Sequence, residues 1–396
     1  MNIVGVYGED YPWDVRVEKL LRGCLDAGHR VRLVCRNLKR RSLVEDADGI
    51  ECHRVLGPLA PGFLSVPAPG NPIWRRAIRR TCEDFKPDLF IVRDLPLAML
   101  VIREAERMGV PALVDMAENH PAMWQNVMDS DPIPLRSWLM KNPGLARRLE
   151  RQVAARASGV FVVVEEMRDH LVRVGAPLDR VHLVSNTPPR SILDFAADPA
   201  DASKGTIDLI YVGHVTRTRG LQQVIAALAV LPDDATPMRF HIVGTGAHLQ
   251  RLQDLAAELG VSDRVIFHGW VESNEVPALV SQCHVGVIPH LKTEHTDTTV
   301  PNKLFDFMAA GLPVIVSNAV PMERIVREQD CGLAFDGALA DSLPGCLRQL
   351  ADPQVRLDMG QRGRQSVSTL YHWERDLDRA LEVVNSLGGV PAAAGS

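Results

Sequence analysis

The chain has 396 residues, 46% of them hydrophobic, and a formal net charge of −5 at pH 7. This length predicts two domains, each with its own core. The acidic balance argues against a general nucleic-acid binder, which needs a cationic surface. The seven cysteines form no CxxC pair, which argues against a disulfide framework or a zinc site. No signal-peptide pattern and no apolar run of 18 residues occurs, so we expect a cytoplasmic protein that does not span a membrane.

The first half of the chain alternates apolar strand-like runs with helical patterns. The strand-like runs are 2–7, 31–35, 88–94, 111–116, 159–164 and 182–186, and the helical patterns are 14–27, 97–108 and 165–174. Continuous apolar strands separated by helices predict a parallel sheet that is covered on both faces. We therefore expect a Rossmann-like domain over 1–188.

A Pro- and Ala-rich stretch, 188–206, reads as a linker, and a second alternation follows it. Its strand-like runs are 208–213, 239–244, 265–269, 285–289 and 313–317, and its helical patterns are 219–231, 247–259, a helix opened by Pro301, 342–350, 353–370 and 373–387. The chain is thus predicted to be α/β, with two Rossmann-like domains. Such sheets bind ligands beyond the carboxyl ends of their strands, so we expect a site in a cleft between the domains.

Polar residues follow the strands of the first domain. Asp14 and Arg16 come after the first strand, in a loop that lacks the GxGxxG spacing of dinucleotide-binding proteins. Asp94 ends another strand, and Glu118 and His120 follow the next one. A carboxylate and an imidazole at that place could orient a hydroxyl or accept a proton. Helix capping explains Asp14 and the 118–120 cluster equally well.

The loop after the first strand of the second domain, 213–220, contains Gly213, Arg217 and Arg219 before a helix start. Cations beside helix N-terminal amides favour an anion, so we expect phosphate binding here. Two further strand ends contribute weaker donor-site candidates. Gly244 and Gly246 could equally form a plain turn, and Trp270 could equally pack in the core.

The stretch 295–318 combines a polar loop, a helix and an apolar strand. Its loop supplies candidate ligand contacts: Asp297, Thr298, Thr299, Val300, Pro301 and Asn302. Lys303 and Asp306 lie three residues apart, hence on one helical face, where they either contact a sugar nucleotide or form a local ion pair.

These motifs carry a family resemblance. YPWDVRVEKLLRGCLDAGHRV, YVGHVTRTRGLQQVI, VGTG, FHGWV and above all VPNKLFDFMAAGLPVIVSN resemble the retaining glycosyltransferases of family 4, which have the GT-B fold. The resemblance spans nearly the whole chain. It implies a nucleotide-sugar donor held by a C-terminal domain over 205–371 and an acceptor held by the N-terminal domain. It also implies that a C-terminal helix, about 372–388, packs back on the first domain.

The resemblance assigns roles only where positions match. The family's cation pair after the first glycine falls on His214 and Arg219, with Arg217 or Lys303 as substitutes for the lost charge. Its two acidic residues, eight apart, fall on Thr298 and Asp306, so only the second carboxylate is preserved and Asp297 is the nearest replacement. His120 is the nearest match to the family's active-site histidine, and Glu118 is its rival.

The implied reaction is hexosyl transfer with retention of configuration to a saccharide, a lipid-linked or a small-molecule acceptor, in glycan, polysaccharide or glycoconjugate biosynthesis. No cofactor or metal is expected. A DxD-like DSD at 129–131 is common by chance. A sugar-nucleotide epimerase or hydrolase and a two-lobed sugar-binding protein are the alternatives.

Two segments bear on a membrane. Residues 57–76 join an apolar loop to a cationic helix, and 133–156 hold apolar residues near several arginines. Such segments could rest on an anionic inner-membrane surface, and they equally fit an ordinary acceptor-binding face.

Overall fold

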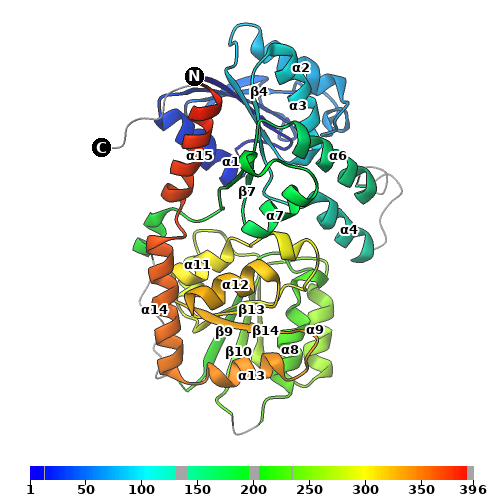
Figure 1. The fold of residues 1–396 in the computed structure, drawn as a ribbon. Coiled ribbons are helices and arrows are strands. Elements are labelled where there is room, and N and C mark those ends of the chain that lie inside the picture. The colour runs from blue at the N-terminus through cyan, green and yellow to red at the C-terminus, as the bar shows by residue number, and fades with distance from the viewer. Residues whose placement is uncertain (13, 131–140, 196–204, 233–234, 390–396) are drawn as a thin grey trace. The chain divides into compact units, whose positions relative to one another are not determined.

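The computed structural model describes residues 1–12, 14–130, 141–195, 205–232 and 235–389. The described chain forms two compact units (Figure 1). Unit 1 contains the described parts of 1–125, 133–186 and 375–396, and unit 2 those of 126–132 and 187–374. In the sequence, the boundary therefore falls within two helices, α4 (His120–Ser130) and α15 (Trp373–Leu387).

Unit 1 is built on one sheet with the strand order β3-β4-β2-β1-β5-β6-β7-β8. Its strands are β1 (Asn2–Tyr7), β2 (Arg30–Cys35), β3 (Val44–Ala47), β4 (Ile50–Arg54), β5 (Leu89–Arg93), β6 (Ala112–Asp115), β7 (Gly159–Val162) and β8 (Val181–Leu183). All described pairings are parallel except that of β3 with β4. The direction in which successive strands are added reverses between β1 and β5: from β1 the chain adds β2 and β4 on one side, and β5 to β8 follow on the other.

Helices cover both faces of this sheet. They are α1 (Val15–Asp26), α2 (Pro72–Cys82), α3 (Leu95–Met108), α4, α6 (Pro143–Arg156), α7 (Glu165–Arg173) and α15, with short 3₁₀ turns η1 (Gly62–Ser65) and η2 (Leu178–Arg180). Right-handed crossovers in opposite directions place α1 on one face and α2, α3 and α6 on the other. Helix α15 packs on α1: a Cβ added to Gly23 would lie 2.2 Å from Cδ1 of Leu377.

The antiparallel edge strand β3 was not predicted from the sequence. It pairs with β4 through a two-residue turn at Asp48 and Gly49, which have φ angles of +52° and +89°. Asp-Gly is a strong signal for a hairpin turn of this hand. The alternating, half-exposed residues of β3 lack the continuous apolar pattern by which most other strands were recognised. The strands β4 and β14 were also not predicted.

Unit 2 has a parallel sheet with the order β11-β10-β9-β12-β13-β14. Its strands are β9 (Ile207–Val212), β10 (Met238–Val243), β11 (Val265–Gly269), β12 (Val285–Ile288), β13 (Val314–Ser317) and β14 (Gly332–Phe335). The helices are α8 (Leu221–Ala229), α9 (Leu249–Glu258), α10 (Val276–Val280), α11 (Lys303–Ala309), α12 (Val320–Gln329), α13 (Ser342–Gln349) and α14 (Pro353–Thr369), with 3₁₀ turns η3 (Arg190–Phe195), η4 (Arg217–Arg219), η5 (Ser262–Arg264) and η6 (Thr296–Thr298). The order reverses between β9 and β12.

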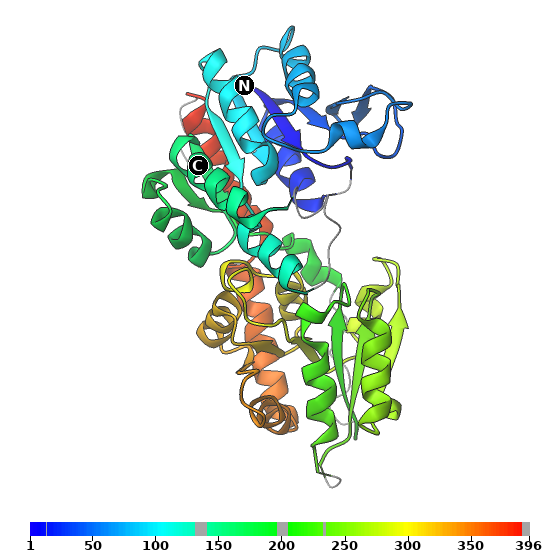
Figure 2. The ribbon, with the colours of Figure 1, turned by 90° about the vertical axis from the view of Figure 1, so that its right-hand side faces the viewer.

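Two helical layers sandwich this sheet (Figures 1 and 2). Helices α8, α9 and α13 pack on one face, over a core that includes Tyr211 and Phe240. Helices α11, α12 and α14 lie on the other face. Glycines permit this second layer: a Cβ on Gly286 of β12 would lie 2.4 Å from Phe307 of α11, and one on Gly360 of α14 would lie 1.9 Å from the Gly311 carbonyl oxygen. Helix α11 is thereby held closely between β12 and α14.

Most predicted elements are confirmed, including the helices at 342–349, 353–369 and 373–387. Four helix starts differ from the predictions by two residues, those at 95, 221, 249 and 303. The helix expected from Arg219 begins at Leu221, because Gly220 has a φ of +71° that interrupts the helical backbone after the η4 turn. The helix expected from Pro301 begins at Lys303. No helix within the described ranges is long and apolar enough to cross a bilayer.

An ionic cluster joins the first three strands of unit 2. Asp208 of β9 accepts hydrogen bonds from Arg239 at 2.7 and 3.0 Å and lies 3.0 Å from Nε2 of His241, both on β10. Nδ1 of His241 lies 3.0 Å from Nε2 of His268 on β11. Burial by itself would raise the pKa of Asp208, but the hydrogen bonds from His241 and Arg239 lower it to about 2.

We expect Asp208→Asn to lower the free energy of unfolding at pH 7 by about 2 kcal/mol, because it weakens hydrogen bonds to a charged group. The native carboxylate stabilises above its unfolded pKa of 3.8, and this contribution is lost as the pH falls towards 2. The difference between variant and wild type, measured by urea unfolding, should therefore shrink in that window. The control is Asp341→Asn, which alters an exposed pair with Arg348 and should change stability little.

Candidate active site

The carboxyl ends of β9, β10 and β11 are joined through their backbones. Gly213 donates to the Val243 carbonyl oxygen at 2.8 Å, and Gly244 donates to that of Gly269 at 2.7 Å. A Cβ on Gly244 would lie 2.0 Å from the Gly213 oxygen, and one on Gly246 would lie 2.1 Å from the Val215 oxygen. The glycines are thus needed for contact between the two loops, whether or not a ligand is present.

Lys303, at the start of α11, reaches the end of β9. Its ammonium lies 4.0 Å from the ring centroid of Tyr211, and a Cβ on Gly213 would lie 2.7 Å from its Nζ. Gly213 therefore leaves room for this cation. Burial lowers the pKa of Lys303 well below its usual value, and the charge of Arg219 lowers it further, whereas Asp306 opposes the shift.

Arg219 packs on His290, which follows β12. One Nη atom of Arg219 lies 3.3 Å from both ring nitrogens of His290, and Leu291 donates to the Thr218 carbonyl oxygen at 2.9 Å. His290 is buried, and burial together with Lys303 and Arg219 lowers its pKa well below the usual value. Sequence analysis did not select His290. Its position just after a strand was the available signal.

Arg219, His290 and Lys303 form the basic cluster of unit 2. Each carries or can carry a positive charge. Burial is the largest cause of the lowered pKa values of Lys303 and His290; the charge of Arg219 lowers both further, and Lys303 also lowers that of His290. The cluster lies where the strand order reverses, between β9 and β12, which is where doubly wound sheets bind ligands. Crowded, partly buried cations of this kind attract an anion such as a phosphate.

The other predicted donor residues follow β9 and β11 or lie at the start of α11. His214 and Arg217 are exposed, and the His214 carbonyl oxygen accepts a 2.7 Å hydrogen bond from Tyr211. Trp270 is 69% exposed beyond β11, and its Nε1 donates to Glu272 at 3.3 Å. On and before α11, two residues are exposed and could meet a ligand: Asn302 and Asp306.

The loop before α11 uses two of its polar side chains internally. Thr298 is buried, and its hydroxyl donates to the Glu294 carbonyl oxygen at 2.8 Å. Asp297 accepts a 2.9 Å hydrogen bond from the Val320 amide, at the start of α12, and lies 3.7 Å from Nζ of Lys292. Thr299 follows η6, Val300 is buried and Pro301 is half-buried. Asp297 thus holds the start of α12.

In unit 1, Arg16 is a buried structural residue. It is 1% exposed, and its guanidinium binds both carboxylate oxygens of Asp115, at distances down to 2.6 Å, and the carbonyl oxygens of Val184 and Ser185. It therefore joins α1 to the ends of β6 and β8. Burial alone would raise the pKa of Asp115, but Arg16 and Arg93 bring it below its usual value. Asp115 was also not selected from the sequence, because it reads as part of a strand.

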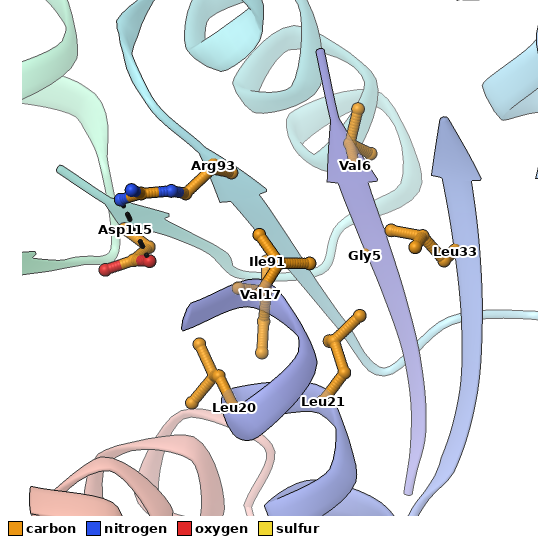
Figure 3. A pocket seen from close by; sticks show the side chains of 9 residues that line it. All are labelled: Gly5, Val6, Val17, Leu20, Leu21, Leu33, Ile91, Arg93 and Asp115. Carbon is orange, nitrogen blue, oxygen red and sulfur yellow. Dashed lines mark hydrogen bonds and ion pairs between the residues drawn. The ribbon is translucent and has the colours of Figure 1, made fainter. Parts of the chain in front are cut away.

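Arg93 connects this pair to Asp14 and Asp94. Its Nη1 lies 3.4 Å from both Asp115 and Asp94, and its Nε lies 3.6 Å from Asp14. Asp14 caps α1 by accepting from the Arg16 and Val17 amides, which is the capping role considered from the sequence. A small pocket beneath α1 ends at Arg93 and Asp115, and its other lining residues are apolar (Figure 3). Its lining does not suit a polar ligand.

Asp94 has a strained backbone. Its φ of +64° and ψ of 170° lie in a region that is almost restricted to glycine. Although it precedes α3, its side chain makes no capping hydrogen bond, and its Oδ1 is buried without a hydrogen-bond partner. Burial raises the pKa of Asp94, while Arg93 and His120 oppose the shift. Strain and an unsatisfied carboxylate at a strand end are typical of functional sites.

His120 and Glu118 adjoin Asp94. His120 is buried at the start of α4, with its Nδ1 3.2 Å from the Glu118 carbonyl oxygen and its ring edge-on to Trp124. Both His120 and Glu118 influence the pKa of Asp94. The structure therefore brings Asp94, Glu118 and His120 to one end of the sheet, near the reversal between β1 and β5. No group of His, Cys, Asp or Glu within the described ranges could hold a metal ion, and Asp131 of the DSD lies outside them.

Two family models match the two halves of the chain. The model of the glycosyl transferase 4-like domain matches residues 14–187, and that of glycosyl transferases group 1 matches residues 196–366, which include the basic cluster. The chain belongs to the group 1 glycosyl transferases.

Relatives and solved structures agree with this membership. The glycosyltransferase is 28% identical over 170 residues to a GDP-mannose-dependent alpha-(1-6)-phosphatidylinositol monomannoside mannosyltransferase of Mycobacterium tuberculosis, a match covering 42% of this chain and 44% of that relative's length. It is 24% identical to the D-inositol 3-phosphate glycosyltransferase of Acidothermus cellulolyticus, covering 91% and 86% of the two chains. The sucrose-phosphate synthase of Thermosynechococcus elongatus has a similar fold, with a TM-score of 0.80 at 18% identity, over 98% of this chain and 100% of the other. The fold is GT-B.

We expect Asp94→Gly to raise the thermal midpoint, because glycine relieves a backbone strain of about 1–3 kcal/mol and sacrifices only the ion pair with Arg93. Sugar transfer should nevertheless fall, because the carboxylate is lost. The matched control, Asp94→Asn, keeps the strained backbone and should lose activity without gaining stability. Full activity in both variants would show that Asp94 has no part in the reaction.

Proposed function

We propose that this glycosyltransferase moves a hexosyl group from a nucleoside-diphosphate sugar to an acceptor hydroxyl with retention of anomeric configuration. The observation that carries the proposal is the basic cluster of Arg219, His290 and Lys303 at the strand reversal of unit 2. It suits a diphosphate. The names of relatives and structural neighbours point the same way: one relative is GDP-mannose-dependent, and a solved neighbour from Anabaena, HepE, is in complex with UDP.

The cluster would act on the leaving group. As the bond between the sugar C1 and the phosphate oxygen breaks, negative charge develops on the diphosphate. Arg219 can bind two phosphate oxygens at once, and Lys303 can supply a point charge. Cations that are already in place need no reorganisation during the reaction, which makes their stabilisation of the transition state effective. We therefore propose that the reaction requires no cofactor beyond the donor co-substrate.

The remaining donor contacts are assigned to side chains of unit 2 that are exposed. Asp306 is exposed on α11 and affects the pKa of Lys303, so its carboxylate is suited to accept from the ribose hydroxyls. Trp270 offers an exposed ring that can stack on the base or the sugar. We assign no sugar contact to Asp297, because its carboxylate binds the start of α12. A saccharide, lipid-linked or small-molecule acceptor would bind unit 1.

In unit 1, Asp94, Glu118 and His120 would orient the acceptor. The acceptor oxygen forms a new bond to C1 on the face that the diphosphate leaves, and its proton passes to a phosphate oxygen of the departing group. This scheme balances the proton without a general base. The three side chains then need only position the hydroxyl, and the contact of the His120 ring with the Glu118 carbonyl oxygen keeps that ring in place.

A panel of UDP-, GDP-, ADP- and dTDP-sugars tests the donor proposal. We expect at least one to raise the thermal midpoint. With that donor, Asp306→Ala should weaken binding by about tenfold, the effect of a lost hydrogen-bonded ribose contact. Arg219→Ala should reduce kcat more than binding, because it stabilises charge that develops in the transition state. Stabilisation by none of the nucleotides or sugars would refute the proposal.

Lys303→Met separates a ligand role from a structural one. Because burial and Arg219 already disfavour the charged lysine, its removal should not lower the thermal midpoint of the free protein. The midpoint shift produced by the stabilising nucleoside diphosphate should shrink, with affinity about tenfold lower. Lys292→Met, on the neighbouring loop, is the control and should leave that shift unchanged. A destabilised variant with an unchanged shift would mean that Lys303 serves the fold alone.

A further inference from the structure

Positive charge is concentrated in one part of unit 1. Residues 36–44 contain four Arg or Lys residues and residues 55–82 contain four more, whereas neither segment contains Asp or Glu. The whole chain has 49 acidic and 44 basic residues, so these two segments run against its overall charge. They adjoin β3 and β4 at the edge of the sheet, and the second segment includes η1 and α2.

The two segments pack against each other as one surface. The Asn37 side-chain amide donates to the carbonyl oxygens of Arg41 and Leu56 at 2.8 and 3.0 Å, which joins the segments. Arg36 donates to the Gly62 oxygen at 3.2 Å, and a Cβ on Gly62 would lie 3.3 Å from the Leu38 side chain. We name residues 36–44 together with 56–66 the docking loops. Figure 2 shows this part of the chain in mid-blue, beside β3 and β4.

The docking loops expose large apolar side chains. Leu59 is 95% exposed and Phe63 60%, and the same loops expose four more: Leu38, Leu43, Val44 and Leu64. Single exposed apolar residues are common, but a group of this size within 27 residues marks an interaction surface. These side chains are supported by internal contacts: Trp74 donates to the Ser65 oxygen at 2.9 Å, and Asn71 donates to those of Leu64 and Val66 at 3.0 Å.

Cations accompany these apolar tips. Lys39 and Arg40 are exposed and directly follow Leu38. Arg36 pairs with Glu9 and Arg41 with Glu45, so the acidic partners come from outside the loops themselves. Apolar side chains that can enter an acyl boundary, next to cations that can meet phosphate headgroups, are the combination by which peripheral proteins bind anionic bilayers.

We propose that the docking loops bind unit 1 to the surface of an anionic membrane, with Leu59 and Phe63 entering the headgroup boundary and Lys39 and Arg40 meeting lipid phosphates. This extends the proposed function by placing the acceptor-binding unit at a lipid surface, where a lipid-linked acceptor is available. The arginine-rich stretch around α6, also considered from the sequence, is not needed for it, and Trp138, Leu139 and Met140 lie outside the described residues.

The test is flotation of the full chain with vesicles of phosphatidylcholine alone or mixed with phosphatidylglycerol, at low and high salt. We expect binding only to the anionic vesicles, weakened by salt. Leu59→Ser with Phe63→Ser should reduce the binding constant at least about tenfold, because two apolar side chains no longer leave water. Lys39→Gln and Arg40→Gln should each reduce it about fivefold, the effect of one cation near an anionic surface.

The control pair is Leu178→Ser with Leu339→Ser, two equally exposed leucines outside the docking loops, which should bind vesicles as the wild type does. Because all these positions are exposed, thermal midpoints should be unchanged. Absence of flotation with anionic vesicles, or equal loss in the control pair, would overturn the proposal. A dimer in solution that Leu59→Ser with Phe63→Ser abolishes would show that a second copy covers the loops instead. The midpoint shift caused by the donor should persist in every variant, so failure here is distinct from failure of the proposed transfer.

Discussion

The repulsion among Arg219, Lys303 and His290 is the constraint on which the donor side of this protein depends. Burial is the largest cause of the lowered pKa values of Lys303 and His290, and the positive charge of Arg219 lowers both further. The fold maintains the arrangement because other contacts fix each member. Phe307 of α11 packs onto Gly286, and Gly360 of α14 approaches Gly311, so α11 cannot move away to relieve the repulsion. The arrangement therefore favours the binding of a negatively charged ligand.

The two units use the same topological position for different chemistry. In each sheet, the strand order reverses beside the first strand of the unit, and the candidate residues gather there. In unit 2 the position collects cations. In unit 1 it collects a mixed set, in which Arg16 and Arg93 neutralise Asp115 and leave Asp94 strained and incompletely bonded. A cationic position suits a leaving diphosphate, and a mixed, hydrogen-bonding position suits a neutral hydroxyl.

Surface charge adds a third level of organisation. The chain is acidic overall, yet the docking loops and α2 contain cations without acidic residues of their own. Arg75 and Arg79 of α2 are paired with Glu104 of α3, so part of this charge supports packing within the unit. The charge on the docking loops accompanies exposed apolar side chains instead. These cations therefore form three groups: those in ion pairs within the fold, those of the basic cluster in unit 2, and the exposed ones on the docking loops.

The sequence by itself indicated most of the strands and helices, though not β4, α12 or β14, because a buried parallel strand reads as a continuous apolar run and a covering helix as a 3.6-residue period. It also indicated Arg219 and Lys303, since cations beside glycine turns and helix starts are visible in the letters alone. The edge strand β3 was not predicted, because it is half-exposed and its apolar pattern is weak. Tertiary structure alone decided which residues act together: His290 joins Arg219 across 71 positions, Asp115 joins Arg16 across 99, and Asp297 turns to the start of α12. The physical reason is that hydrogen bonds and burial depend on distance in space, which the period of a sequence does not encode.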